Sequence, residues 1–495
     1  MAEKILAISF FLPIISALLL IPAFPNFNLE FLAWISMIPL FFSLENNNAK
    51  QRFFKGYLFG IVFFAGTLYW LFNISIPGNI GLVLLLSLAP AIFCYLYLYD
   101  KRYPLYAVVY VPSAWVLTEY LRAHLFTGFP WVLLGYSQSF NLPLIQFADI
   151  TGAYGLSFLI ILVNFGLYLA LRKAPRRFYI LFFISVLIAA SLIYGERAIR
   201  RFNPARTLKI SVIQGNIPQK IKWDPKYRDF IMDQYQRITK SAIAEERPDL
   251  VIWPETSLPG YIEEEGLRTA ISGLARSEKI HLLIGALHGE GLNAFNSACL
   301  ISDKGEVMER YDKIHLVPLG EFVPFEDRLS WIRSCVNKPM GDFIRGRNYT
   351  VFKFKTGAGS YSFSCLICYE DIFPELSRRF VERGARFLVN VTNDAWFGKT
   401  SAPYQHLQGS IFRAVENHVP VLRAANTGVS CIIDPNGKVT AIVKKGEDEI
   451  CVDGYVTGVA SMTFVKTFYT RFGDLFAWIC IILVLLMYKS TRKIS

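Results

Sequence analysis

The sequence predicts an all-helical membrane domain of eight transmembrane helices together with an α/β domain. Long apolar runs occupy residues 1–195 and one more nearly ends the chain, whereas the region after residue 208 alternates short strands with helices. Hydrophobic residues make up 53% of the 495 residues and charged residues only 18%, where soluble domains carry about 25% charged residues. This composition excludes a purely soluble protein and also a disordered one.

Eight apolar runs are candidates for membrane spans, each of which needs about 20 mostly apolar residues. They lie near residues 5–24, 31–45, 56–73, 80–99, 104–121, 154–171, 178–195 and 475–487. The second run is short, so it is either tilted or partly re-entrant. The first run is not a cleaved signal peptide, because a small-residue processing site is missing and further spans follow at once.

Basic residues in the short loops predict the orientation of the spans. One set of loops and the C-terminal tail carry Lys50, Arg52, Lys55, Lys101, Arg102, Arg172, Lys173, Arg176, Arg177, Lys489, Arg492 and Lys493. The alternate loops 25–30 and 74–79 carry no Lys or Arg. Since such an excess marks the cytoplasmic side, both termini are expected in the cytoplasm and residues 196–470 outside it. Four arginines between residues 197 and 206 oppose this orientation, but large translocated domains are largely exempt from the bias.

Two features near the fifth and sixth spans have alternative interpretations. The loop 122–153 is rich in aromatic residues, glycine and proline, so it is either an interfacial anchor or the lining of a lipid entrance. Glu119 is either an interfacial residue or a functional carboxylate within the membrane.

The region from residue 208 onward alternates strand-like and helix-like segments, which favours a layered α/β architecture. Strands are expected at 208–214, 249–253, 281–286, 298–302, 361–367, 387–391, 419–424 and 429–433. Helices are expected at 224–246, 266–279, 372–383 and 404–417, and a hairpin turn at 434–437. At about 250 residues the region is either one domain or a duplicated sandwich.

Two charged residues follow apolar segments of this region. Glu255 stands directly after the strand Leu250–Trp253, at the end where α/β sheets place their ligands. A carboxylate desolvated beside aromatic residues can act as a general base, although most such glutamates are structural or solvated. Lys313 precedes an apolar loop that leads to Glu321. A lysine among apolar groups is costly unless paired, so Lys313 is expected to pair with Glu321 or Glu255, unless it is an ordinary surface lysine.

Cys368 lies where a strand runs into the start of a helix. A thiol near helix amides has a lowered pKa and is a better nucleophile, and the backbone N–H of Tyr369 could stabilise an oxyanion. Cys365 completes a CxxC pattern, but residues three apart on a strand face opposite sides and a second Cys pair is missing, so a redox or zinc site is disfavoured.

The remaining His and Cys residues do not indicate a metal site. His315 is expected to be a hydrogen-bonded packing residue, because a second ligand at a suitable spacing is missing. The other cysteines are expected to be small buried hydrophobic residues, namely Cys94, Cys299, Cys335, Cys431, Cys451 and Cys480. No metal, no other cofactor and no nucleic-acid partner is therefore expected.

The three groups together resemble the Glu-Lys-Cys triad of the nitrilase, or carbon–nitrogen hydrolase, superfamily. The match consists of Glu255 in WPET, Lys313 in YDKIHLVPLGE and Cys368 in CYE. With the preceding spans included, the whole chain resembles the apolipoprotein N-acyltransferase family of the bacterial inner membrane. Further matching motifs are TGFPW at 127–131, QGNIP at 214–218, KWD at 222–224 and NDAWFG at 393–398.

The resemblance implies a domain organisation. Residues 1–200 would hold seven spans, residues 207–456 would form a catalytic αββα sandwich, and residues 457–495 would hold a linker and the eighth span. The catalytic domain would be periplasmic.

The resemblance also implies a reaction, in which a phospholipid donates an acyl chain to the N-terminal diacylglyceryl-cysteine of an apolipoprotein. This is the last step of lipoprotein maturation. Cys368 would form the thioester acyl-enzyme, Glu255 would be the general base, and Lys313 with the Tyr369 amide would hold the oxyanion. Kinetics would be ping-pong.

Four further residues receive supporting roles from the resemblance. Glu321 would orient Lys313, and Glu370 would support the turn that carries the thiol. Trp223 and Trp396, together with Tyr369, match aromatic positions near the substrate entrance of the family.

Two alternatives remain at this point. A membrane-tethered amidase would use the same triad with a different acceptor, although one helix would suffice for tethering. A transporter or scaffold would use the outer domain only for binding, but transporter spans usually carry interior ionisable residues and paired repeats. Here Glu119 is the chief intramembrane candidate and no internal repeat is visible.

Overall fold

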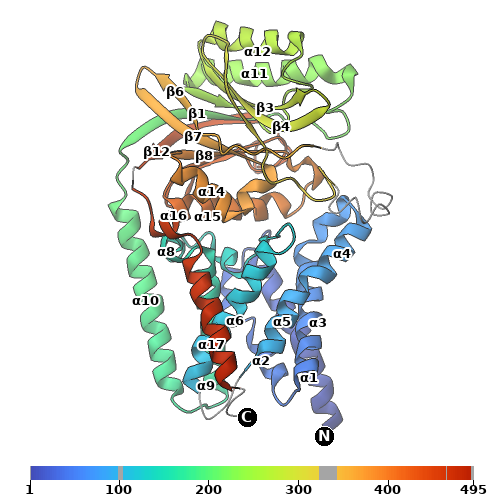
Figure 1. The fold of residues 1–495 in the computed structure, drawn as a ribbon, viewed down its shortest axis with the longest axis vertical. Helices are drawn as coiled ribbons and strands as arrows, with labels where there is room; N and C mark the ends of the chain where they lie inside the picture. The colour runs from blue at the N-terminus through green and yellow to red at the C-terminus, as the bar shows by residue number, and fades with distance from the viewer. Residues whose placement is uncertain (1, 99–103, 323–342, 464, 492–495) are drawn as a thin grey trace. The chain divides into compact units, whose positions relative to one another are not determined.

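The computed structural model describes residues 2–98, 104–322, 343–463 and 465–491 (Figure 1). The chain divides into two compact units. The first consists of residues 1–202 and 472–495 and is helical, whereas the second, Asn203–Arg471, contains two β-sheets and their helices. The predicted boundary between residues 456 and 457 falls inside the last strand of the second unit, β12 (Gly454–Met462).

The first unit forms a helix at each of the apolar runs. Its helices are α1 (Ala2–Leu20), α2 (Ile38–Leu44), α3 (Ala49–Thr67), α4 (Ile76–Leu86), α5 (Leu88–Leu96), α6 (Pro104–His124), α7 (Leu142–Ile145), α8 (Ala148–Thr151), α9 (Ala153–Leu171), α10 (Arg177–Arg201) and α17 (Leu475–Thr491). Local signals start some of them: α3 begins with a capping box, in which the Asn48 side chain accepts from the backbone N–H of Gln51.

Three segments of the described chain are long and apolar enough to cross a membrane: Ile76–Leu96, Ala153–Leu171 and Arg177–Arg201. The apolar helices Ser9–Ala23, Glu30–Leu44 and Leu475–Lys489 are shorter. The predicted second span is interrupted, because a 3₁₀ turn over Glu30–Trp34 precedes the seven residues of α2. Helix α3 is not among the three long apolar segments, and it carries three basic residues near its start, Lys50, Arg52 and Lys55. By length and composition the structure therefore supports three of the eight predicted spans.

The end of α6 is tied to the loop that follows it. Glu119 is 3% exposed, and its carboxylate accepts the backbone N–H of Leu134 at 2.7 Å. Arg122 donates to the carbonyl oxygens of Phe129 and Trp131 at 2.9 and 2.7 Å. Glu119 is therefore a buried residue that anchors this loop.

The second unit contains two six-stranded sheets, whose strand orders are β12-β1-β2-β3-β4-β5 and β11-β10-β9-β8-β7-β6. In each sheet three neighbouring strands are parallel, β1-β2-β3 in one and β7-β8-β9 in the other, and the remaining pairings are antiparallel. The strands are β1 (Arg206–Gln214), β2 (Leu250–Ile252), β3 (His281–Glu290), β4 (Asn293–Ile301), β5 (Val307–Asp312), β6 (Phe352–Thr356), β7 (Gly359–Ile367), β8 (Phe387–Thr392), β9 (Val421–Ala425), β10 (Cys431–Ile433), β11 (Val439–Ile442) and β12.

Helices cover the outer face of each sheet, which gives the unit four layers (Figure 1). Helices α11 (Arg228–Glu246) and α12 (Glu265–Glu278) lie on one side, and α14 (Pro374–Glu382) and α15 (Ala402–Asn417) lie on the other. The αββα sandwich implied by the family resemblance is confirmed, and all four helices coincide with predicted segments.

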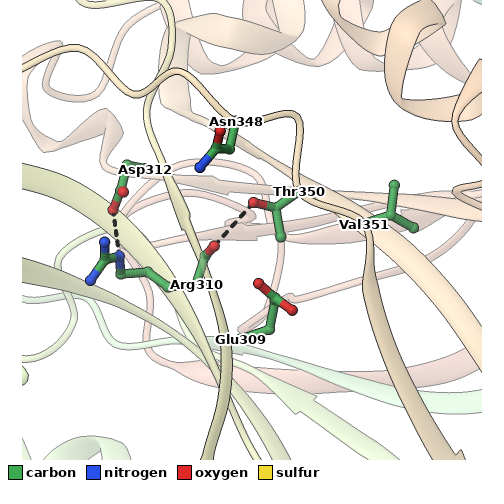
Figure 2. Close-up of a pocket in the computed structure, with 6 residues that line it drawn as sticks. All are labelled: Glu309, Arg310, Asp312, Asn348, Thr350 and Val351. Atoms are coloured by element: carbon green, nitrogen blue, oxygen red, sulfur yellow. Dashed lines mark hydrogen bonds and ion pairs between the residues drawn. The ribbon is translucent and has the colours of Figure 1, made fainter.

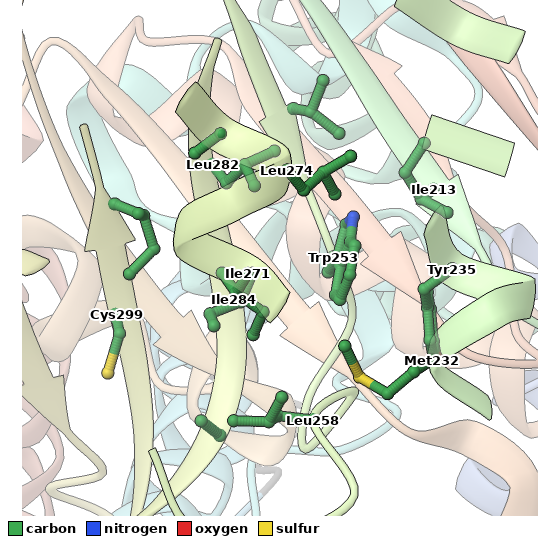
Figure 3. Packing of buried hydrophobic residues seen from close by; sticks show 14 of the residues in the cluster. Ile213, Met232, Tyr235, Trp253, Leu258, Ile271, Leu274, Leu282, Ile284 and Cys299 are labelled. Carbon is green, nitrogen blue, oxygen red and sulfur yellow. The ribbon is translucent and has the colours of Figure 1, made fainter. Parts of the chain in front are cut away.

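The core between the first sheet and its helices is built around Trp253 (Figure 3). The indole ring stacks on Tyr235 of α11 with ring centroids 5.0 Å apart, and its N–H donates to the Thr239 hydroxyl at 2.8 Å. Burying two large aromatic rings stabilises this layer, and a satisfied indole N–H removes the cost of burying a polar group. The residue that follows β2 is thereby fixed two positions before Glu255.

Four strands were not expected from the sequence: β5, β6, β11 and β12. Strand β12 pairs antiparallel with β1 over its whole length, so the first and last strands of the unit are neighbours. The expected hairpin turn is confirmed, because Asp434 accepts the backbone N–H of Gly437 at 2.9 Å between β10 and β11.

Candidate active site

Glu255 lies just beyond the carboxyl end of β2 and is 6% exposed. Its close approach to β3 depends on a glycine, because a Cβ at Gly285 would lie 2.3 Å from the Pro254 carbonyl oxygen and 2.6 Å from the Glu255 Cα. Asn296 of β4 donates its side-chain N–H to Glu255 Oε1 at 2.8 Å. Neighbouring strands of one sheet thus hold this carboxylate in place.

Lys313 follows β5 directly and is 1% exposed. Its Nζ lies 2.8 Å from Glu321 Oε1 and 3.6 Å from Glu255 Oε1, so the expected ion pairing of this lysine is confirmed with both carboxylates. Burial alone lowers the pKa of Lys313, but Glu321 and Glu255 together raise it above its ordinary value. The side chain is therefore a permanent ammonium at neutral pH.

Asn296 joins the two carboxylates and was not found from the sequence. The same side-chain amide that contacts Glu255 also donates to Glu321 Oε1 at 2.9 Å, and the amide is 1% exposed. We call Glu255, Asn296, Lys313 and Glu321 the Lys313 cluster. A single asparagine within a strand cannot be recognised as a site residue from the sequence, because strand alternation shows only that the position faces inward and not what the side chain contacts.

Cys368 is the first residue after β7 and begins a 3₁₀ turn over Cys368–Ile372. Its φ angle is 52°, which places a non-glycine residue in the left-handed region. Its backbone carbonyl accepts from the Asn390 side chain at 3.0 Å. The strand end and β8 together define the direction of this sharp turn.

The predicted lowering of the thiol pKa is wrong. Burial raises the pKa of Cys368 above its ordinary range, Glu255 raises it further, and Lys313 opposes them. The 3₁₀ turn is only five residues long, so its amides do not offset the desolvation of a thiolate. A thiol in this state needs a base to take its proton. Glu255 is the charged group with the largest effect on the pKa of this thiol.

Glu370 links the thiol turn to the segment that carries Lys313. Its carboxylate is fully buried and accepts the backbone N–H of Ile367 at 2.7 Å, of Ile314 at 2.7 Å and of His315 at 2.9 Å. The Tyr311 hydroxyl donates to it at 2.8 Å. Burial raises the pKa of Glu370 to about 7, against the effect of these donors. One carboxylate thus holds together two chain segments that are far apart in the sequence.

A second buried lysine near Glu255 was also not singled out from the sequence. Lys222 is 3% exposed, and its ammonium donates to the backbone carbonyl of Glu255 at 3.0 Å. Burial lowers the pKa of Lys222 to about 8. The KWD motif covers this position, but a role was expected only for Trp223.

The aromatic residues lie at different depths. Trp223 and Trp396 are each 38% exposed, and they follow Lys222 and the buried Asp394 closely along the chain. The Tyr369 ring is buried and packs edge-on against Phe373 with ring centroids 5.0 Å apart. His315 stacks on the same Phe373 ring at 3.8 Å, which confirms that it is a packing residue.

The cysteines other than Cys368 are mostly buried, as expected. Cys365 is fully buried and free, and burial raises the pKa of its thiol. Cys94, Cys299, Cys431 and Cys480 are buried too. The prediction for Cys451 is wrong, because this residue is exposed. It lies in a loop, and its φ angle is 57°. Cys335 lies outside the described residues.

A surface pocket of about 520 Å³ opens beside β5 (Figure 2). Its lining includes Arg310 and Asp312, which form an ion pair at 2.9 Å, and Thr350, whose hydroxyl donates to the Arg310 carbonyl at 3.0 Å. None of the predicted site residues lines it. The candidate site is therefore the buried polar cluster at the strand ends and not this charged pocket.

Comparison with known proteins identifies the family. A model of the carbon–nitrogen hydrolase domain matches residues 209–454, and a model of the apolipoprotein N-acyltransferase N-terminal domain matches residues 16–166. Apolipoprotein N-acyltransferase from Geobacter metallireducens is 39% identical over 95% of this chain and 93% of its own length. The chain belongs to the apolipoprotein N-acyltransferase family. It is accordingly a bacterial membrane-associated acyltransferase, which excludes the amidase and the transporter alternatives.

Other members of the family match over similar lengths. The protein from Pasteurella multocida is 30% identical over 97% of this chain and 94% of its own length. Among solved structures, an amidase from Nesterenkonia sp. has 22% sequence identity and a TM-score of 0.40, and covers 54% of this chain.

Proposed function

We propose that this enzyme transfers an acyl chain from a phospholipid to the α-amine of an N-terminal diacylglyceryl-cysteine of an apolipoprotein, through a thioester on Cys368. One arrangement carries the proposal: the buried ammonium of Lys313 lies 2.8 Å from Glu321 and 3.6 Å from Glu255, and both Glu255 and Lys313 act on the pKa of the Cys368 thiol. In this proposal Cys368 is the nucleophile, Glu255 is the base, and Lys313 is the cation for the developing oxyanion.

In the first half-reaction Glu255 takes the proton of the Cys368 thiol. The sulfur attacks the ester carbonyl carbon of the phospholipid, and a C–S bond forms. Lys313 and the backbone N–H of Tyr369 stabilise the oxyanion of the tetrahedral intermediate. The ester C–O bond then breaks, and the lysophospholipid leaves with the proton that Glu255 held.

In the second half-reaction the α-amine of the acceptor attacks the thioester carbonyl carbon. Glu255 accepts a proton from the amine, the C–N bond forms, and the C–S bond breaks. The sulfur recovers a proton from Glu255, which returns the enzyme to its starting state. A covalent intermediate splits one difficult transfer into two steps at one site, so the kinetics are ping-pong.

The remaining predicted residues fit supporting roles in this scheme. Glu321 lies 2.8 Å from Lys313 and also accepts the backbone N–H of Val317 at 2.8 Å, so it orients the ammonium. Glu370 fixes the turn that carries the thiol. The half-exposed rings of Trp223 and Trp396 are available to contact the acyl donor or the lipidated acceptor.

The membrane setting follows from the chemistry of both substrates, which are anchored in a bilayer. We assign eight transmembrane helices to the first unit, both termini to the cytoplasm and the catalytic unit to the periplasmic side of the inner membrane. Three apolar helices of full membrane length and the basic loops on one side support this arrangement. An apolar setting also excludes water, which would hydrolyse the thioester.

Intact-mass analysis tests the proposal. The purified full-length chain is incubated with phospholipid in detergent, and its mass is measured before and after a diacylated lipopeptide is added. The expected result is one acyl adduct on the enzyme, which is lost when the lipopeptide appears in its triacylated form. Cys368→Ala gives neither product, whereas the matched control Cys365→Ala gives both. Wild-type enzyme that acylates the lipopeptide without any adduct at any time, or an active Cys368→Ala variant, contradicts the mechanism.

A further inference from the structure

A second group of buried charges lies behind the Cys368 turn, and the proposed chemistry does not use it. We call Asp371, Asp394, His406, Ser410 and Arg423 the His406 cluster; each is at most 1% exposed. They come from the 3₁₀ turn at Cys368–Ile372, the 3₁₀ turn at Asp394–Trp396, α15 and β9. Buried charges are costly unless they are paired and hydrogen-bonded, so their arrangement decides what they do.

His406 stands between the two carboxylates of the cluster. Its Nε2 lies 2.7 Å from Asp371 Oδ1, and its Nδ1 lies 3.1 Å from Asp394 Oδ1. An ionised carboxylate only accepts hydrogen bonds, so both ring nitrogens donate and the ring is an imidazolium. Burial lowers the pKa of His406, but Asp371 and Asp394 outweigh it and raise the pKa to about 9. The ring cannot serve as a proton acceptor in this state.

Arg423 balances the second oxygens of the same carboxylates. Its guanidinium lies 2.6 Å from Asp371 Oδ2 and 3.7 Å from Asp394 Oδ2. The Ser410 hydroxyl also donates to Asp371 Oδ2, at 2.5 Å. Two cations and two anions give this cluster no net charge, and its ion pairs hold His406 in place.

His406 also contacts the backbone of Cys368, the proposed nucleophile. His406 Nε2 lies 3.3 Å from the carbonyl oxygen of Cys368, and the Asn390 side chain donates to the same oxygen at 3.0 Å. The single Nε2–H is shared, because it also donates to Asp371 Oδ1 at 2.7 Å. This shared N–H and the Asn390 N–H together restrict the orientation of the Cys368 peptide group. They also offset part of the roughly 1–2 kcal/mol that a left-handed non-glycine residue costs.

That peptide group contains the proposed oxyanion donor. The Cys368 carbonyl and the Tyr369 N–H belong to one peptide unit, which is planar and trans, so the N–H points in the opposite direction to the carbonyl oxygen. A cationic donor on the oxygen also polarises the peptide and strengthens its N–H as a donor. Fixing the Cys368 carbonyl oxygen therefore also fixes the direction of the Tyr369 N–H, which points the opposite way.

We propose that His406, held between Asp371 and Asp394, is a positioning residue that aims the Tyr369 N–H at the oxyanion by fixing the Cys368 carbonyl. The inference rests on the proposed function, because it assumes that acyl transfer from Cys368 passes through an oxyanion. It assigns His406 no contact with substrate.

Two reactions of the same thiol separate this role from a general structural one. Acylation by phospholipid passes through a tetrahedral oxyanion, whereas alkylation by iodoacetamide is a direct displacement that forms none. His406→Gln and His406→Ala are compared with wild type in the full-length protein. The first-order rate of acyl-enzyme formation at saturating phospholipid is expected to fall about 10²–10³-fold in His406→Ala, the range for loss of an oxyanion donor. The KM for phospholipid and the alkylation rate are expected to stay within about threefold, since neither depends on that donor.

His406→Gln keeps a neutral donor for the Cys368 carbonyl, so its acylation rate should lie between those of wild type and His406→Ala. His418→Asn, which changes a residue at the C-terminal end of the same helix, is the matched control and should leave both rates unchanged. If both His406 variants fail to fold, Asn390→Ala reaches the same carbonyl from β8 and should slow acylation without slowing alkylation.

Equal losses of acylation and alkylation, or an unchanged acylation rate in folded His406→Ala, would overturn the inference. So would an unchanged acylation rate in Asn390→Ala when the His406 variants do not fold. Wild-type enzyme that forms no acyl adduct while it still acylates lipopeptide is a different outcome, because it refutes the proposed function itself.

Discussion

Two buried charged clusters act on Cys368, and they differ in how their charges are satisfied. In the Lys313 cluster, Lys313 is closer to Glu321 than to Glu255, at 2.8 against 3.6 Å, and the described contacts of the Glu255 carboxylate come from Asn296 and Lys313. In the His406 cluster both carboxylates are contacted by two cations, and the charges cancel. In the proposed mechanism the first arrangement supplies the carboxylate that exchanges a proton, whereas the second contacts the backbone carbonyl of Cys368.

Buried charges around one cysteine can therefore serve two purposes: one cluster is assigned to the reaction, and the other to the position of the backbone. Both clusters carry the desolvation cost of burying ions. Glu255 and Lys313 of the Lys313 cluster act in opposite directions on the pKa of the Cys368 thiol, whereas His406 contacts the carbonyl oxygen of the same residue. Variants that remove one group from each region test this division.

The largest effect is expected from Lys313→Met. Removing the cation leaves Glu255 and Glu321 as two adjacent buried carboxylates, and breaking a buried pair in this way costs about 3–5 kcal/mol of stability. Acyl-enzyme formation should fall by more than about 10³-fold, because the oxyanion loses its cation. Thermal unfolding and quenched intact-mass kinetics measure the two losses. A Lys313→Met variant that retains wild-type acylation would show that this cluster is only structural.

Gly285→Ala should reduce activity by displacing Glu255 without changing any charge. A Cβ at this position would lie 2.3 Å from the Pro254 carbonyl oxygen and 2.5 Å from the Thr256 nitrogen, so the backbone around Glu255 must shift. Overpacking of this kind costs about 1–3 kcal/mol, and misplacing a catalytic group can cost about 10²-fold in rate. The measurement is the acylation rate with the unfolding midpoint.

The matched control for this variant is Gly273→Ala on α12, where an added Cβ has no heavy atom within 4 Å. It should stabilise the helix by about 0.5–1 kcal/mol and leave the rate unchanged. If Gly285→Ala behaves like Gly273→Ala, the close approach of Glu255 to β3 does not matter for catalysis.

Glu370 gives a test based on pH, because it connects the thiol turn to the Lys313 segment. Burial raises its pKa from 4.5 to about 7, so the folded chain keeps a proton that the unfolded chain releases. Its contribution to stability is therefore complete below pH 4.5 and is lost as the pH rises through 7. The loss amounts to about 3 kcal/mol at 1.36 kcal/mol for each pKa unit.

Glu370→Gln cannot titrate, so its unfolding midpoint should change less between pH 4.5 and 7 than that of wild type. The variant should also be less stable at pH 5, since an amide cannot accept from all the backbone donors at this position. Parallel curves for the two proteins over this pH range would show that Glu370 does not hold the proton.

The smallest effect is expected from Ser410→Ala in the His406 cluster. Asp371 loses one neutral donor but keeps His406 and Arg423, so the loss should be about 1 kcal/mol of stability. Acylation should stay within about threefold of wild type, as measured in the lipopeptide assay. A loss of activity as large as that of His406→Ala would mean that the cluster works as a single unit and that His406 has no separate role.

Much of the site could be predicted from the sequence because its key residues follow apolar strands in recognisable motifs. Glu255 follows β2 closely, and Lys313 and Cys368 stand directly after β5 and β7. A polar residue beyond the carboxyl end of an apolar strand is where α/β folds place their ligands. The motifs around them resemble those of one superfamily, and the αββα sandwich was predicted from that resemblance. Asn296 could not be found in this way, because its role depends on which strands are neighbours.

Other features depend on energies that a local pattern does not report. The thiol pKa was predicted to be low from the nearby helix start, but the desolvation of Cys368 outweighs the amides of a short turn. Strand β12 pairs with β1 although the paired residues are 240 or more positions apart in the chain, so no local periodicity indicates its partner. The second predicted span appears as a 3₁₀ turn over Glu30–Trp34 and a short helix, α2, which has Pro39 in its first turn.

The central claim is that the thioester on Cys368 is a true intermediate, and a single-turnover chase tests it most directly. Enzyme acylated with a labelled phospholipid is separated from all free lipid and then mixed with diacylated lipopeptide. The account predicts that the label moves from Cys368 to the lipopeptide amine in one turnover without added phospholipid. Label that stays on the enzyme until fresh phospholipid is supplied would contradict it.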